Sequence, residues 1–191
     1  MMLSWQNTKP MKIPRRMMKG LTMILNDEQY KAVWDRVYKE LQFFPNCADR
    51  NSGTLFPPFV INKNHVIYGI ENTDDDISQM NLLITNAFIE CTNPGERIYA
   101  LDWHHSAFLY DPRNRDEQQS VFVSDEKHMG GGYNAYFPDY YPDGDYYFFI
   151  SEDFRFGYLT HPWREEAWVF GDELIKEFEC FYESIGWIKL K

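Results

Sequence analysis

The sequence lacks the long apolar runs of a membrane protein. It also lacks the cysteine patterns of a disulfide-rich secreted protein. Its longest apolar runs are about five residues, as in Tyr146 to Ile150, whereas a membrane-spanning helix needs about 20. Only three cysteines are present, Cys47, Cys91 and Cys180. None belongs to a CxxC pair, so a disulfide framework or a zinc–thiolate site is not indicated. We therefore expect a cytoplasmic protein that does not interact with membranes.

Recognisable catalytic motifs are also missing. The chain has no GxSxG elbow, no catalytic-cysteine context and no Walker loop. The triplet Gly130 to Gly132 lacks the strand-to-helix setting of a phosphate-binding loop. The HxH, HExxH and HxxxH spacings of common metal sites are absent. The sequence therefore leaves open whether the protein is an enzyme and identifies no cofactor.

Charge is unevenly distributed along the chain. The first 22 residues hold five basic and no acidic side chains, while the remainder holds 14 basic and 29 acidic ones, a net charge of −15. We interpret residues 1–22 as a flexible extension and residues 23–191 as a single domain. So acidic a domain would repel nucleic acids and anionic membranes and attract a basic protein partner. Solubility alone is the competing explanation of the charge. The oligomeric state stays open.

Hydrophobic spacing predicts the elements of this domain. Apolar residues recur at helical intervals from Tyr30 to Leu41, which predicts a helix over 27–43. A second helix is expected before Asn93 and a third from Asp172. Short β-rich segments predict strands; they are 65–70, 97–103, 107–110, 121–123, 145–150, 156–159, 166–170 and 187–190. These elements predict an α+β fold, a mainly antiparallel sheet packed against two or three helices.

Four polar side chains stand close to predicted strands. They are Asp102, His105, Asp145 and His161. If the central strands are neighbours, as consecutive strands usually are, these groups converge at one end of the sheet. Such a cluster binds a divalent cation or acts as acid and base. A structural alternative has the aspartates accepting backbone N–H groups at strand ends and His161 held in a corner by Pro162.

Aromatic residues accompany these polar groups. Trp103, Tyr146 and Trp163 lie next to them in the sequence and are candidate ligand-binding residues. At strand spacing, aromatic side chains also commonly form core. Both interpretations stay open.

Two sequence blocks resemble a bacterial family of domains of unknown function. The first block is Ala100-Leu101-Asp102-Trp103 with His105 and Pro112; the second is Pro142 to Tyr147 with Asp153-Phe154, Gly157, His161-Pro162-Trp163 and Gly171. The likeness covers about residues 24 to 184. It implies a stand-alone bacterial protein and supplies no catalytic residues. Thr160 replaces an expected glycine, and the segment 113–140 is longer than in the family pattern.

Three functions are compatible with these observations. The first is a non-catalytic binding module for a small polar ligand or peptide at Asp102, His105, Asp145 and His161. The second is an acidic interaction protein, such as a toxin-neutralising immunity protein, that binds a basic partner. The third is a metal-assisted hydrolase that uses the same four residues.

Overall fold

A computed structural model describes residues 22–45, 58–70, 77–117, 120–125 and 130–191. The predicted extension over 1–22 lies almost wholly outside this range. The described helices are α1 (Asp27–Glu40), α3 (Ile77–Glu90) and α4 (Asp172–Glu179), with the short 3-10 helices η2 (Pro112–Glu117) and η3 (Tyr182–Ile185). The strands are β1 (Met23–Ile24), β2 (His65–Gly69), β3 (Ile98–Asp102), β4 (Ala107–Tyr110), β5 (Ser120–Ser124), β6 (Gly132–Tyr136), β7 (Tyr147–Ser151), β8 (Gly157–His161), β9 (Glu166–Phe170) and β10 (Ile188–Lys189).

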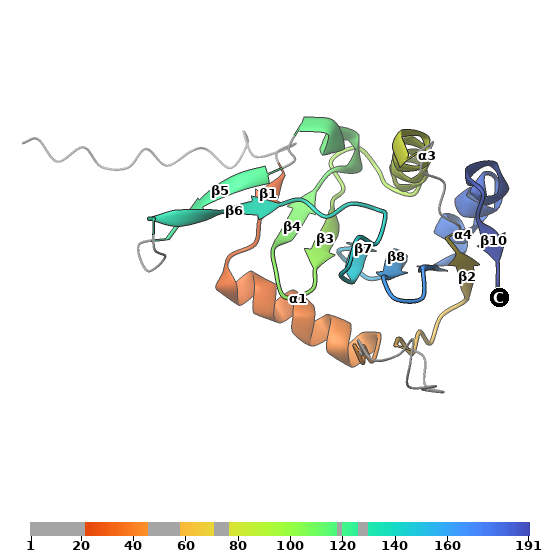
Figure 1. Ribbon diagram of the computed structural model, residues 1–191, viewed down its shortest axis with the longest axis horizontal. Coiled ribbons are helices and arrows are strands. Elements are labelled where there is room, and N and C mark those ends of the chain that lie inside the picture. Colours follow the sequence, from red (N-terminus) through yellow and green to blue (C-terminus); the bar gives the residue numbers. More distant parts are fainter. Residues whose placement is uncertain (1–21, 46–57, 71–76, 118–119, 126–129) are drawn as a thin grey trace, which may run out of the picture.

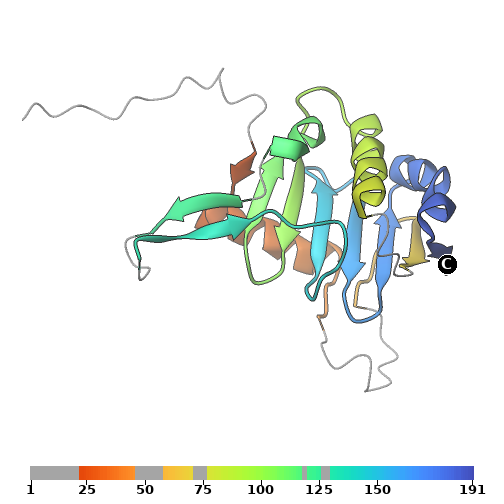
Figure 2. The ribbon, with the colours of Figure 1, turned by 45° about the horizontal axis from the view of Figure 1, so that its top comes forward.

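Eight of these strands form one antiparallel sheet in the order β1-β4-β3-β7-β8-β9-β2-β10. The remaining two, β5 and β6, form a separate antiparallel ribbon. Figures 1 and 2 show the large sheet with helices on both faces and the ribbon projecting from its end near β1 and β4. The predicted α+β class, with a mainly antiparallel sheet against two or three helices, is confirmed.

The sheet is buried on both faces because its central strands carry apolar residues at consecutive positions. In β7 and β8 every residue is buried. Phe148 faces α1 and packs with Trp34, whereas the next residue, Phe149, faces the opposite way and packs with Phe88 of α3. Successive side chains of a strand point to opposite faces, so continuous apolar strands require a helical layer on each side, α1 on one and α3 with α4 on the other.

Helix α1 begins as its sequence predicts. The Asn26 side chain accepts the Gln29 backbone N–H at 2.9 Å, and the Gln29 side chain accepts the Asn26 N–H at 3.1 Å. This reciprocal capping box satisfies two backbone donors that the helix itself leaves unpaired. The helix ends three residues earlier than predicted, at Glu40.

Two strands were missed, and both lie at the periphery. β1 is only two residues long and pairs with β4. β6 lies in a glycine- and tyrosine-containing segment without alternating apolar residues, and it pairs with β5 from Ser120↔Tyr136 to Ser124↔Gly132. Among the described residues, every helix is too short or too polar to span a bilayer.

Candidate functional site

The first part of the candidate site is the turn that joins β3 to β4. The His105 N–H donates to the Asp102 carbonyl at 3.1 Å, and the Asp102 N–H donates to the Ser106 carbonyl at 3.0 Å. These bonds close a tight turn in which His104 has a φ of +69°, the left-handed region that residues other than glycine adopt uncommonly. The turn brings the side chains of Asp102 and His105 to the same side.

The second part is the segment that enters β7. Strands β3 and β7 pair with Asp102 opposite Tyr147, and the Trp103 N–H donates to the Tyr146 carbonyl at 3.1 Å. Asp145 therefore lies beside the β3–β4 turn. Its Oδ1 accepts the Tyr146 N–H at 2.8 Å, which fixes the carboxylate and directs Oδ2 toward His105.

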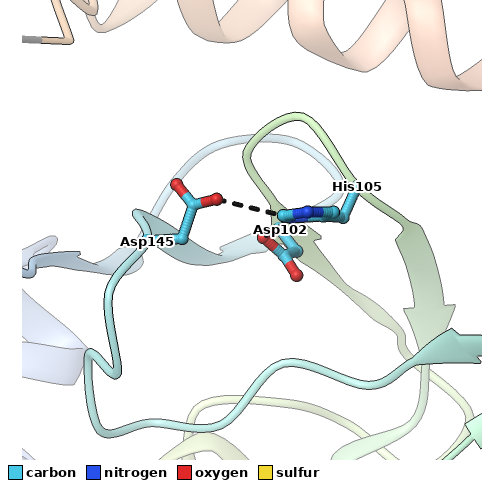
Figure 3. Close-up of side chains that lie close together, drawn as sticks. All are labelled: Asp102, His105 and Asp145. Atoms are coloured by element: carbon cyan, nitrogen blue, oxygen red, sulfur yellow. Dashed lines mark hydrogen bonds and ion pairs between the residues drawn. The ribbon is translucent and has the colours of Figure 1, made fainter.

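Asp102, His105 and Asp145 meet at this place; we call the three residues the Asp102 corner. His105 Nδ1 lies 3.0 Å from Asp102 Oδ1 and 3.4 Å from Asp145 Oδ2. One ligand atom from each side chain lies within 4.8 Å of the other two. Figure 3 shows the three side chains pointing toward one another from the two chain segments.

The charged forms of the two carboxylates of the Asp102 corner are disfavoured by burial. Burial is the main cause that raises the pKa of Asp102 to about 6; Asp145 and Asp143 add to the shift, and the His105 bond opposes it. Burial likewise raises the pKa of Asp145. The bond to Asp102 raises the pKa of His105. Within the described part of the chain, His105 is the only positively chargeable group bonded to Asp102 or Asp145.

His161, the fourth predicted polar residue, does not join the corner. It is fully buried in β8, and its Nε2 lies 3.3 Å from the Tyr146 hydroxyl. Three of the four predicted groups thus come together, while the fourth sits behind a buried tyrosine. The structure therefore places His161 in the core beside Tyr146 and not in the corner.

The three predicted aromatic residues form a continuous contact behind the corner. The rings of Trp103 and Trp163 lie 5.7 and 5.3 Å from that of Tyr146, both edge to face. Tyr146 is fully buried and serves as core. Trp103 and Trp163 are half-buried and pack against the α1-side core, so of the three only these two keep part of the ring surface accessible.

Three further residues border the corner and were not among the sequence candidates. Asp143 raises the pKa of Asp102 and accepts a hydrogen bond from the Tyr147 hydroxyl. From α1, Tyr38 accepts the Trp103 indole N–H at 3.3 Å. Burial is the main cause of the raised pKa of Tyr30, and Asp102 contributes to it. Both tyrosines belong to the apolar face of α1. Their hydroxyl groups were the feature of the sequence that indicated a polar environment next to this face.

Two carboxylates and one imidazole nitrogen at these distances are suited to a divalent cation. Ligand distances of about 2.0–2.2 Å to an ion such as zinc place neighbouring ligand atoms roughly 3–4 Å apart, close to the separations around His105. Imidazole favours zinc and similar transition metals, and carboxylates also suit manganese. A protonated His105 donates to Asp102 and forms an ion pair with Asp145 instead, so the ion and the proton on Nδ1 compete.

Comparisons with known proteins agree with one another. Residues 24–175 match a family model described as "Protein of unknown function (DUF2716)". The chain is 31% identical over 158 residues to "Uncharacterized protein YxiI" of Bacillus subtilis (strain 168). The aligned residues make up 81% of this chain and 90% of that relative. No solved structure matches the chain. All three residues of the Asp102 corner lie within the matched range.

Proposed function

Because this chain belongs to the family described as "Protein of unknown function (DUF2716)", its function has to be inferred from its own geometry, and we propose that it is a binding module for a divalent cation held by Asp102, His105 and Asp145. Membership of a bacterial family of unknown function confirms the sequence-based prediction. The description carries no activity over to this chain.

The single observation that carries the proposal is the convergence of three ligand atoms within 4.8 Å. The charges support it. The side chains of Asp102 and Asp145 are only 14% and 21% exposed, and burial raises the pKa of each. A bound cation would offset both the burial of the carboxylates and their mutual repulsion, so the ion-free corner is less stable than the occupied one.

The corner also fits the small polar ligand expected from the sequence. Three protein ligands leave at least one coordination position for water or for an oxygen of a bound molecule. His105 is 64% exposed, so this position faces solvent. A carboxylate or phosphate group would then bind to the protein through the ion, next to the segment that carries the half-buried Trp103.

Titration calorimetry with zinc and with manganese tests the proposal, on protein first treated with a chelator. We expect binding at one site per chain and a raised Tm when the ion is added. Asp145→Asn and His105→Gln should each weaken binding at least about tenfold, because each removes one of three ligands. Absence of heat and of a Tm shift with either ion would contradict the proposal.

The chain offers a matched control for each ligand. Asp143 lies two residues before Asp145, and His104 directly precedes His105. Neither belongs to the three-residue group. Asp143→Asn and His104→Asn should therefore leave the stoichiometry unchanged and alter affinity far less than the ligand variants. Equal losses in the control and ligand variants would indicate a diffuse electrostatic effect instead of coordination.

A basic protein partner is the second candidate. It is favoured by the net charge of −15 over residues 23–191 and by Asp143 beside the corner. A lysine or arginine side chain would then occupy the place of the ion. Affinity for such a partner should fall steeply with salt and survive a chelator, whereas coordination of zinc should be lost with the chelator and depend weakly on salt.

A further inference from the structure

Strand β5 does not belong to the main sheet. Its sequence, Ser120-Val121-Phe122-Val123-Ser124, reads the same in both directions. An antiparallel pair of two such strands centred on Phe122 places Phe122 opposite Phe122, Val121 opposite Val123, and Ser120 opposite Ser124. Every residue would face one of its own kind. A two-fold axis through Phe122 generates this pairing, which is the symmetry of most protein dimers.

The outer edge of β5 is oriented for such pairing. The Asp125 N–H donates to the Gly131 carbonyl at 3.1 Å, so these two residues form a hydrogen-bonded pair of the ladder. Bonded and non-bonded pairs alternate along antiparallel strands. The backbone groups of Ser120, Phe122 and Ser124 therefore point away from β6. In the parts of the chain that the structure describes, β6 is the only strand paired with β5.

The side chains of the ribbon also favour association. Phe122 is 62% exposed and lies over Gly132 of β6, where a Cβ atom would come within 2.6 Å of its ring. Tyr136, on the same face of β6, is 65% exposed. On the other face, Val121 and Val123 pack against the main core, which anchors the ribbon to the body of the protein.

The absence of charge on β5 and β6 favours a second copy of this chain as the partner that binds the outer edge of β5. The ten residues of β5 and β6 carry no charge, although a quarter of the chain is charged and its net charge is −10. Two copies of so acidic a protein repel each other unless they meet through a neutral surface. Natural edge strands usually carry a charge, most often lysine, that prevents pairing, and β5 has none.

We propose that β5 is a self-association edge, at which two copies of this chain pair antiparallel about Phe122 to form a four-stranded sheet β6-β5-β5-β6. The ribbon projects from the main sheet (Figures 1 and 2), and antiparallel pairing places the second body beyond the opposite end of the ribbon. A two-stranded ribbon is marginal alone, and added strands with an apolar face increase its stability. Five residue pairs bury less than the roughly 1,000 Å² of a stable interface, so the dimer is weak.

Sedimentation velocity over a wide range of concentrations tests this dimer. The full chain should shift from monomer to dimer with a micromolar to millimolar dissociation constant. Phe122→Lys places two like charges directly opposite each other and should weaken association at least about tenfold. Tyr136→Lys makes the same change to an equally exposed aromatic residue of the same face, but away from the outer edge, and should leave association unchanged. A monomer at every concentration would overturn the proposal, as would equal effects of the two variants.

A cross-link tests the register and does not depend on how well Phe122→Lys folds. The proposed pairing puts Ser120 opposite Ser124 of the second copy, with Cα atoms about 5.5 Å apart, within the range that a disulfide spans. A mixture of Ser120→Cys and Ser124→Cys proteins should form a disulfide-linked dimer on mild oxidation. Each variant alone should form no more dimer than the unaltered chain, whose Cys180 is exposed. Equal yields from the mixture and the single variants would contradict this register.

Discussion

Strands β3 and β7 have a polar cluster at each end, and the two clusters differ in their charge balance. At one end lies the Asp102 corner. At the other end, Glu96 lies just before β3, Asp153 and Arg155 lie just after β7, and Glu173 comes from α4; we call these four residues the Arg155 corner. Both clusters combine several carboxylates with one group that can carry positive charge.

In the Arg155 corner the cation is permanent and fully engaged. The Arg155 guanidinium donates to Glu173 at 2.7 Å, to the Cys91 carbonyl at 2.7 Å, and to Glu96. Its bond to Glu96 is the main cause of the lowered pKa of that carboxyl. Burial acts to raise the pKa of Asp153, but the backbone N–H and guanidinium of Arg155 outweigh it.

The Asp102 corner lacks such a cation, and its carboxylate pKa values move the other way. The comparison gives a physical distinction between a structural cluster and the proposed binding site. Carboxylates that the fold uses for its own stability come with an internal cation and have lowered pKa values. Carboxylates held without one have raised pKa values, and they gain stability when they are protonated or when a cation arrives from outside.

The largest effect is expected from removing the internal cation. Arg155→Met leaves three carboxylates and the Cys91 carbonyl without their common donor, and should lower the free energy of unfolding by about 2 kcal/mol near neutral pH. Arg97→Met is the control, because Arg97 lies 3.4 Å from Glu152 in an exposed pair worth less than about 1 kcal/mol. Urea unfolding measures both. Equal losses would mean that Arg155 acts as an ordinary surface charge.

The opposite sign is expected at the other end of the strands. Asp102→Asn removes a buried negative charge but retains an oxygen that accepts the His105 N–H. Since the pKa of Asp102 is about 6 instead of 3.8, the variant should be more stable than the unaltered protein by roughly 1 kcal/mol at pH 8, in a chelator. The same variant should bind zinc more weakly. A loss of stability in urea would place Asp102 with the structural carboxylates.

A pH series separates the two corners further. The folded-state pKa of Asp102 is raised, so the stability linked to its protonation is present below about 3.8 and is lost as the pH rises through about 6. The gain from Asp102→Asn should therefore grow across that window. The pKa of Glu96 is lowered from 4.5, so the cost of Arg155→Met should persist above 4.5 and shrink only at lower pH. Urea unfolding from pH 3 to 8 gives both profiles, and a gain from Asp102→Asn that is the same at every pH would contradict this assignment.

Much of the architecture was predictable because periodicity reports burial. β4 and β9 were predicted with their observed bounds, since each apolar run is flanked by polar residues. β6 was missed because its sequence, Gly-Tyr-Asn-Ala-Tyr, has no apolar alternation. Its pairing with β5 depends on a partner strand and on the path of the loop between them, which local sequence does not encode.

The candidate site was predictable in its members but not in its geometry. Asp102 and Asp145 stand at strand ends, where polar residues next to apolar strands are conspicuous, and the antiparallel sheet brings them together. His161 has the same local signature, yet it belongs to β8, one strand further along, and points into the core. Which face a strand residue takes depends on register, and sequence spacing alone did not fix that register.

The smallest expected effect concerns backbone conformation, which again differs between the corners. Phe154, next to Arg155, has a φ of +61°, and its ring is buried, so packing offsets the strain. His104 has a φ of +69°, but its ring is exposed and packs against the neighbouring Trp103. His104→Gly should therefore raise the free energy of unfolding by about 0.5 kcal/mol, whereas the β-branched His104→Val should lower it. Thermal unfolding measures both; a loss in the glycine variant as large as that in the valine variant would mean that the ring contact outweighs the strain.

Zinc affinity of His104→Gly should stay unchanged, because the three ligands of the Asp102 corner remain and the turn bonds that place them do not involve the His104 side chain.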